Sequence, residues 1–173
     1  MPAEAVVLAF LSPRANVGVK MKIYCAGPLF TPYHRAFIAQ NAQRLRQEGF
    51  ECFVPQEQEI NLPGRTTSPR EIFDVDLAGV QRANALVALL DGPDVSSGTA
   101  CEIGIFYALM LRDPTKKGIL GLVTDHRVAR RQAAGAKEGL NFFTRGCIEK
   151  VGKICLTLDE IIEILTGWDR ELQ

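Results

Sequence analysis

Two carboxylates in this sequence, Glu102 and Asp76, have side chains suited to nucleophilic or acid–base catalysis. Glu102 follows a turn of small and hydroxyl residues at 96–99, and we expect it in the first turn of a helix. A helix N-terminus favours the ionised carboxylate that a nucleophile requires. Asp76 falls about halfway along another predicted helix. A protonated Asp beside an ionised Glu is the arrangement that cleaves a glycosidic bond with retention, because two close carboxylates raise the pKa of one of them.

Each of these residues also has a structural explanation that the sequence leaves open. Thr99 and Glu102 have the spacing of a capping box, in which the Glu only stabilises the start of its helix. Asp76 would then be a solvated surface carboxylate. Tyr24 is either a core residue or the hydroxyl that orients a nucleophile. Ser96 and Asn141 also fit the roles of a turn residue and a helix N-cap.

Alternating apolar runs and helical periodicities define the elements that must position these side chains. Strands are predicted at 22–26, 51–54, 85–90, 117–123 and 153–156, and helices at about 32–48, 68–83, 99–112, 141–149 and 157–165. Strands without polar alternation are buried on both faces, as in parallel sheets. We therefore predict an α/β, flavodoxin-like, doubly wound open sheet of about five parallel strands with helices on both faces and the order 2-1-3-4-5. Ligands bind such sheets beyond the carboxyl ends of the first and third strands.

Composition and charge exclude several classes of protein. The 20 basic and 20 acidic residues of this 173-residue chain give a net charge of zero, which argues against nucleic acid or an anionic membrane as partner. No apolar run approaches the roughly 18 residues of a membrane span. Five cysteines without a Cys-x-x-Cys pair indicate reduced thiols in a cytoplasmic protein, and two distant histidines argue against a zinc site. We expect one domain at 21–173, preceded by an extension at 1–20 whose role the sequence leaves open.

Four segments, taken in order and spacing, resemble the nucleoside 2-deoxyribosyltransferase family. They lie at 23–30, 76–80, 97–104 and 140–146, and the resemblance runs from residue 21 to about 165. It implies that Glu102 attacks the anomeric carbon and forms a glycosyl-enzyme ester. It also implies that Asp76 exchanges a proton with the base and that Tyr24 holds the nucleophile.

The resemblance has further implications for binding. Asn141 would reach the sugar 5′ end in the site of a neighbouring subunit, so a homo-oligomer is implied. Gly27 and Gly98 lie in the matching motifs and are substrate-binding candidates. The implied partners are a small-molecule nucleoside or nucleotide and a nucleobase, and no metal or organic cofactor is expected.

Position 96 departs from the family pattern and leaves the substrate open. Transferases of the family commonly have Asp six residues before the nucleophile, where it meets the 5′-hydroxyl, and this chain has Ser96. Serine there resembles the related deoxynucleoside 5′-monophosphate N-glycosidases, although those have serine where this chain has Asn141. Asp94 either replaces the missing Asp or is a turn residue. Three interpretations follow: a deoxyribosyltransferase, a monophosphate N-glycosidase that uses water, and a non-catalytic nucleotide-binding module.

Overall fold

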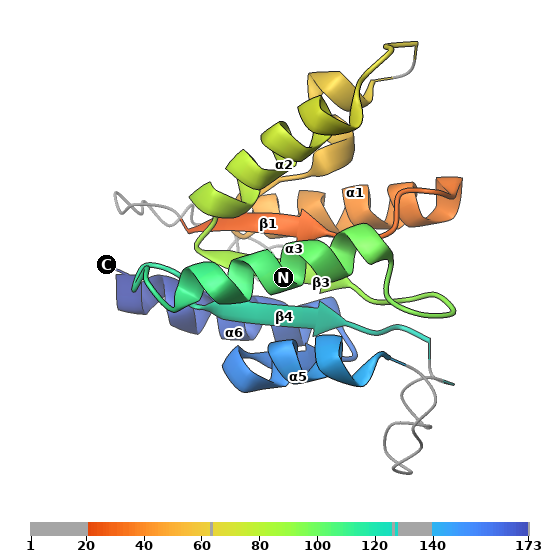
Figure 1. The fold of residues 1–173 in the computed structure, drawn as a ribbon. Helices are drawn as coiled ribbons and strands as arrows, with labels where there is room; N and C mark the ends of the chain where they lie inside the picture. The colour runs from red at the N-terminus through yellow and green to blue at the C-terminus, as the bar shows by residue number, and fades with distance from the viewer. Residues whose placement is uncertain (1–20, 63, 126, 128–139, 173) are drawn as a thin grey trace, which may run out of the picture.

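The computed structural model describes residues 21–62, 64–125, 127 and 140–172. Its centre is a five-stranded parallel sheet of order β2-β1-β3-β4-β5 with helices on both faces (Figure 1). The strands are β1 (Lys22–Ala26), β2 (Glu51–Phe53), β3 (Ala85–Leu89), β4 (Gly118–Leu122) and β5 (Lys153–Cys155). The helices are α1 (Pro32–Gln47), α2 (Pro69–Arg82), α3 (Ser97–Met110), α5 (Phe142–Val151) and α6 (Leu158–Leu172). The predicted fold class and strand order are confirmed. The expected extension at 1–20 lies outside the described residues.

Each face of the sheet has its own apolar core, because successive strand residues point to opposite faces. Helices α1 and α6 cover one face and pack on strand residues that include Ile23 and Val87. Helices α2, α3 and α5 cover the other face, where Tyr24 and Leu86 are fully buried (Figure 1). Tyr24 therefore points toward the layer that carries Glu102 and Asp76.

Helix α2, which carries Asp76, is held at both ends. At its start, which agrees with the predicted helix at 68–83, Ser68 and Glu71 form a capping box: the Ser68 hydroxyl accepts from the Glu71 N–H, and the Glu71 carboxylate accepts from the Ser68 N–H. At its end the buried Lys116 ammonium donates to the carbonyls of Gln81 and Ala83, at 2.9 and 2.7 Å. A helix restrained in this way presents Asp76 in a fixed position.

The start of α3 differs from the prediction. The helix begins at Ser97, two residues before the expected start, so Glu102 lies in its second turn. Thr99 is buried, and its hydroxyl has no hydrogen-bond partner among the described residues. The capping-box interpretation of Thr99 and Glu102 is therefore wrong, because the chain turns into the helix at Ser96 and the Glu102 side chain points toward β1 instead.

The last helix is longer than expected. Its apolar stripe continues through Trp168 and Leu172, which pack against the core that contains Ile161 and Leu165. This packing extends the helix beyond the predicted end at 165 and outweighs the weak helix propensity of Gly167. Among the described helices, none combines the length and apolar character needed to cross a membrane.

Candidate active site

Glu102 is held by a hydrogen bond from Tyr24. The Tyr24 hydroxyl donates to Oε1 of Glu102 at 2.7 Å, the short distance typical of a hydroxyl bound to a carboxylate. The two residues come from different elements, since Tyr24 lies in the middle of β1 and Glu102 lies on α3. No described residue donates to the other oxygen of Glu102, so this oxygen is available to react. Of the two interpretations of Tyr24, the structure shows both at once: a core ring and an orienting hydroxyl.

Glu102 and Asp76 share one hollow of about 220 Å³ between α2 and α3. Burial raises the pKa of Glu102 to about 7, with the hydrogen bond from Tyr24 opposing this rise and the charge of Asp76 adding to it. Burial also raises the pKa of Asp76 to about 6. The pair therefore retains a proton near neutral pH, in contrast to two solvated carboxylates.

The asymmetry of the pair comes from its hydrogen bonds. Tyr24 favours the charged form of Glu102, while Oδ1 of Asp76 is buried without a partner among the described residues. Burial outweighs the Tyr24 bond and gives Glu102 the higher pKa of the two, so the reaction requires the shared proton to lie on Asp76 instead, from which it can pass to a ligand in the hollow. The interpretation of Asp76 as a solvated surface carboxylate is wrong.

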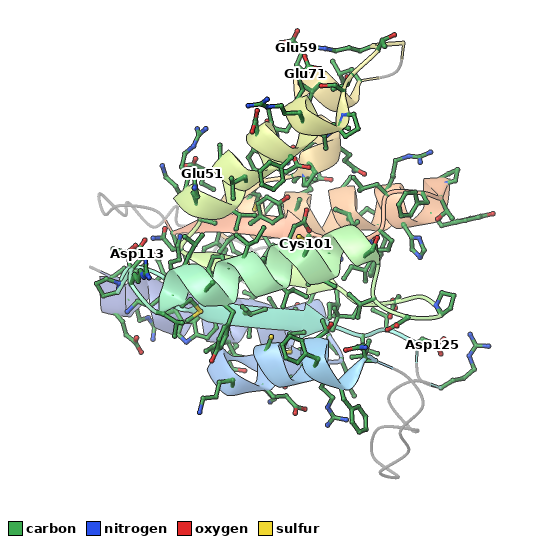
Figure 2. The ribbon with its side chains drawn as sticks, viewed as in Figure 1. Glu51, Glu59, Glu71, Cys101, Asp113 and Asp125 are labelled. Carbon is green, nitrogen blue, oxygen red and sulfur yellow. The ribbon has the colours of Figure 1, made fainter. Side chains whose placement is uncertain are left out.

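The walls of this hollow are apolar. Its lining residues are Pro69, Ile72, Phe73, Asp76, Leu77, Val80, Gly98, Cys101, Glu102 and Ile105. Phe73 keeps half of its surface exposed, and Cys101 lies on α3 on the side that faces the viewer in Figure 2. A flat, uncharged ring fits such walls, and the two carboxylates provide the polar contacts.

A second hollow, of about 230 Å³, lies at the carboxyl ends of β1 and β3, where the sequence predicted a crevice. Its lining residues are Pro28, Phe30, Thr31, His34, Asp91, Gly92, Pro93, Asp94, Ser96 and Ser97. Ser97 lines this hollow and Gly98 lines the first, so both hollows border the start of α3. Within the part of the chain that the structure describes, no lysine or arginine lines either hollow.

Asp94 connects this second hollow to Asn141. Oδ1 of Asp94 accepts hydrogen bonds from the N–H of Val95 at 2.7 Å and of Asn141 at 3.2 Å. The exposed Asn141 caps α5 through its side-chain oxygen, which accepts from the N–H groups of Phe143 and Thr144. The N-cap interpretation of Asn141 is thus confirmed.

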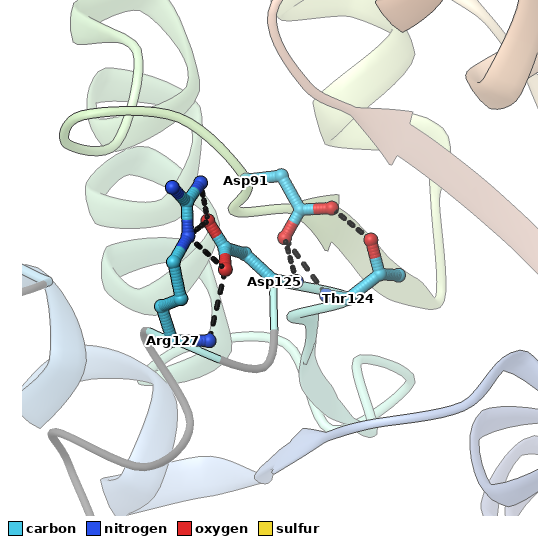
Figure 3. A network of polar contacts seen from close by, with 4 residues as sticks. All are labelled: Asp91, Thr124, Asp125 and Arg127. Atoms are coloured by element: carbon cyan, nitrogen blue, oxygen red, sulfur yellow. Dashed lines mark hydrogen bonds and ion pairs between the residues drawn. The ribbon is translucent and has the colours of Figure 1, made fainter.

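Asp91, at the end of β3, joins the loops that follow β3 and β4. It accepts hydrogen bonds from the N–H and the hydroxyl of Thr124 and from the N–H of Asp125, as Figure 3 shows. Asp125 in turn pairs with Arg127 at 2.7 Å. The network fixes the rim of the second hollow, and this role of Asp91 was not predicted, because it depends on contacts with the distant loop after β4.

Other residues lie elsewhere than the sequence suggested. Gly27 lines neither hollow; a Cβ there would lie 2.8 Å from Ile38 and 3.1 Å from Leu89, so it allows close packing of α1 on the sheet. Gln56, in the segment after β2, lines neither hollow and donates to the carbonyl of Arg35 in a separate groove along α1. Ile72 and Phe73, which line the first hollow, were missed, although their spacing from Asp76 on one helix was a usable signal. Among the described residues, no group of three or more His, Cys, Asp or Glu could hold a metal ion.

Comparisons with known proteins show the family of this chain. The sequence profile of the family described as nucleoside 2-deoxyribosyltransferase matches residues 23–155. An uncharacterised protein of Ureaplasma parvum is 32% identical over 139 residues, which are 75% of this chain and 84% of that protein.

Solved structures with the same fold include several bacterial and protozoan proteins. A conserved protein of Enterococcus faecalis V583 is 28% identical with a TM-score of 0.69, over 86% of this chain and 99% of that chain. The 2-deoxyribosyltransferase of Bacillus psychrosaccharolyticus is 20% identical with a TM-score of 0.57, over 82% and 90% of the two chains. That of Leishmania mexicana is 20% identical with a TM-score of 0.51, over 72% and 85%. With most of its length matched by the family profile, the chain belongs to the nucleoside 2-deoxyribosyltransferase family.

Proposed function

We propose that this protein is a nucleoside 2-deoxyribosyltransferase, which moves the deoxyribose of a 2′-deoxyribonucleoside from one nucleobase to another. The observation that carries the proposal is the pair of carboxylates in one apolar hollow, one held by Tyr24 at 2.7 Å and the other without a partner among the described residues. Family membership supports the same class of enzyme.

The first half of the reaction makes a covalent intermediate. The free oxygen of Glu102 attacks C1′ of the sugar, and the C1′–N bond breaks with its electron pair moving to the base. Protonated Asp76 gives its proton to a base nitrogen, so the base leaves neutral. Tyr24 keeps the Glu102 carboxylate oriented during the attack.

The second half reverses these steps with a new base. Asp76, now ionised, takes a proton from the incoming base, whose nitrogen attacks C1′. The ester bond to Glu102 breaks, and its electrons return to the carboxylate. Two displacements at C1′ retain the configuration of the sugar. The raised pKa values of both carboxyl groups suit this exchange of a single proton near neutral pH.

The two hollows suggest how a nucleoside lies. Each is smaller than the ~300 Å³ of a typical ligand pocket, and both border the start of α3. We place the base between Phe73 and Ile105, the sugar over Gly98, and the 5′ end beside Asp94 and Ser96. The two carboxylates in the second hollow, Asp91 and Asp94, favour an uncharged 5′-hydroxyl over a phosphate.

A second candidate is hydrolysis of a deoxynucleoside 5′-monophosphate. It is favoured by Ser96 and Ser97, two hydroxyls at the first turn of α3, where free N–H groups attract an anion. The nearby Asp91 and Asp94 carboxylates oppose a phosphate at the same place.

A homo-oligomer and a cytoplasmic location are part of the proposal. Asn141 is exposed, and its side-chain amide nitrogen makes no hydrogen bond to a described residue. That amide could therefore contact the 5′ end of a sugar in an adjacent subunit. Sedimentation of the wild type and of Asn141→Ala, with and without a nucleoside, tests this role.

One assay distinguishes the candidates. The protein is incubated with deoxyinosine and adenine, and separately with deoxynucleoside monophosphates alone, and products are followed by chromatography. Formation of deoxyadenosine supports transfer, whereas free sugar phosphate without base exchange contradicts it. If Glu102→Ala cleaves as fast as the wild type, the nucleophile is assigned wrongly. Ligand binding without any cleavage by the wild type identifies a binding module.

A further inference from the structure

The Tyr24 ring is supported from the side by Phe53. Tyr24 and Phe53 are directly paired across β1 and β2, so their side chains leave the same face of the sheet. Their rings stack with centroids 5.2 Å apart and planes inclined by 13°. On its other side Tyr24 is paired with Leu86 of β3. The Tyr24 ring is thus held between two apolar neighbours, and its hydroxyl reaches Glu102.

Phe53 is the outer member of this row. Among the described strands β2 lies at the edge of the sheet, so none of them lies beyond Phe53 to support the Tyr24 ring. If the Phe53 ring is removed, the Tyr24 ring gains space to tilt toward the edge of the sheet. The hydrogen bond to Glu102 would then lengthen, because it depends on the position of the ring.

Gly79 of α2 closes over the Phe53 ring. A Cβ at position 79 would lie 2.7 to 2.8 Å from three carbons of that ring, closer than real carbon atoms approach. Glycine is therefore what allows the α2 backbone to rest on Phe53. Asp76 lies three residues earlier on the same helix, on a neighbouring part of its surface. The contact between Gly79 and Phe53 thus sets how close Asp76 comes to β1.

We propose that Phe53 and Gly79 are positioning residues for the reaction, with Phe53 as a spacer that fixes both the Tyr24–Glu102 hydrogen bond and the approach of Asp76. Neither residue lines the hollow of the two carboxylates, so neither contacts the substrate there. The kinetic part of this inference rests on the proposed function; the part that concerns the pKa of Glu102 does not.

The structure can accommodate the Gly79→Ala substitution without unfolding. A small hollow of about 80 Å³ adjoins both Phe53 and Gly79, on the side of Lys22 and Arg82. In Gly79→Ala the Phe53 ring can shift into this hollow and away from Tyr24. Gly167→Ala is the matched control, since Gly167 is also a helical glycine but its Cβ would meet no atom within 4 Å.

The kinetic test is a double-mutant cycle. We expect Phe53→Ala and Gly79→Ala each to lower kcat for deoxyribosyl transfer by about tenfold or more, with KM within about twofold, because a misplacement near 1 Å reduces rates strongly. In the Phe53→Ala background Gly79→Ala should have no further effect on kcat, since no ring is left for its Cβ to meet. Additive losses, or loss of melting temperature with unchanged kcat, would overturn the proposal.

The second test needs no activity. The pKa of Glu102 is followed by NMR of its side-chain carboxyl, with Glu102→Gln for assignment. Loss of the Tyr24 hydrogen bond should raise this pKa, so Gly79→Ala and Phe53→Leu should move it in the same direction as Tyr24→Phe. An unchanged value in Phe53→Leu contradicts the proposal even if Gly79→Ala does not fold. If the wild type cleaves no nucleoside but the pKa shifts as expected, the proposed function fails and the positioning stands.

Discussion

The two hollows at the start of α3 are built in different ways. In the hollow between α2 and α3, Glu102 is fixed by a fully buried tyrosine, and Asp76 lies on a helix held at both ends. In the hollow beyond β1 and β3, Asp94 is exposed on a loop and its hydrogen bonds go to backbone N–H groups. The first is organised by core packing, and the second by loops.

Under the proposed function, this difference corresponds to two tasks. Covalent chemistry at C1′ needs carboxylates with raised pKa values and fixed positions, which only a packed, partly dry site provides. Recognition of the 5′ end needs a hydroxyl or phosphate contact that loops can change without disturbing the core. Substitutions in the first hollow should therefore affect the rate of every substrate, and those in the second should affect the choice among substrates.

The largest expected effect comes from Glu102→Gln, which keeps the size of the side chain and removes its nucleophilic charge. We expect transfer to fall by about 10³-fold or more for all nucleosides, measured by chromatography of exchanged bases. Glu163→Gln, an exposed residue of α6, is the control and should leave the rate unchanged. A glutamine variant with wild-type turnover would show that catalysis lies elsewhere.

Asp76→Asn should lower the rate by about 10²-fold to 10³-fold, because the base leaves without a proton. The loss should be smallest for nucleosides whose base is a good leaving group even when unprotonated. Asp74→Asn, on the same helix but exposed, is the matched control. If the rate falls equally for all leaving groups, Asp76 does not act as the acid that protonates the base.

Tyr24→Phe should lower kcat by about tenfold, the effect of one hydrogen bond to a charged group. The ring and its stacking on Phe53 are retained, so the fold is preserved. Without the hydroxyl the pKa of Glu102 rises above about 7, and the acidic limb of the kcat/KM profile moves to higher pH. An unmoved limb would mean that Tyr24 does not stabilise the charge of Glu102.

Ser96→Asp tests the second hollow and should change preference more than rate. A carboxylate there should favour deoxynucleosides over their 5′-monophosphates by about tenfold, through repulsion of the phosphate. The control is Ser96→Asn, because asparagine has the size of aspartate without its charge. This variant should leave the preference between the two substrates unchanged. The measurement is the ratio of kcat/KM for the two substrates. An unaltered ratio in Ser96→Asp would show that Ser96 does not contact the 5′ end.

The smallest expected effect concerns stability. The folded-state pKa of Glu102 is raised from 4.5 to about 7, so its contribution to stability is full below pH 4.5 and is lost as the pH rises through 7. Glu102→Gln removes this buried charge and should therefore stabilise the protein more at pH 8 than at pH 5, by about 1–3 kcal/mol. Urea unfolding at both pH values measures the difference. Equal effects at both would show that Glu102 is not desolvated in the folded state.

The sequence by itself determined the elements and their order. Apolar runs and helical periodicity placed the strands of a parallel sheet, and the Ser68-Pro69-x-Glu71 signal marked the start of α2 correctly, because these features depend on neighbouring residues. Motif order also selected Glu102, Asp76 and Tyr24, which the fold brings together from three elements. The same reasoning from neighbouring residues was wrong at Thr99. A capping box was predicted there, but α3 begins at Ser97, two residues before Thr99.

Only the tertiary structure decided what surrounds these residues. The contact of Tyr24 with Glu102 joins positions 78 residues apart, and the support by Phe53 depends on strand register. The role of Gly79 depends on how closely α2 approaches the sheet. None of these can be read from local spacing, because they arise when distant segments pack. Burial then changes the pKa of both carboxyl groups, and it is this desolvation that turns two ordinary acids into a candidate catalytic pair.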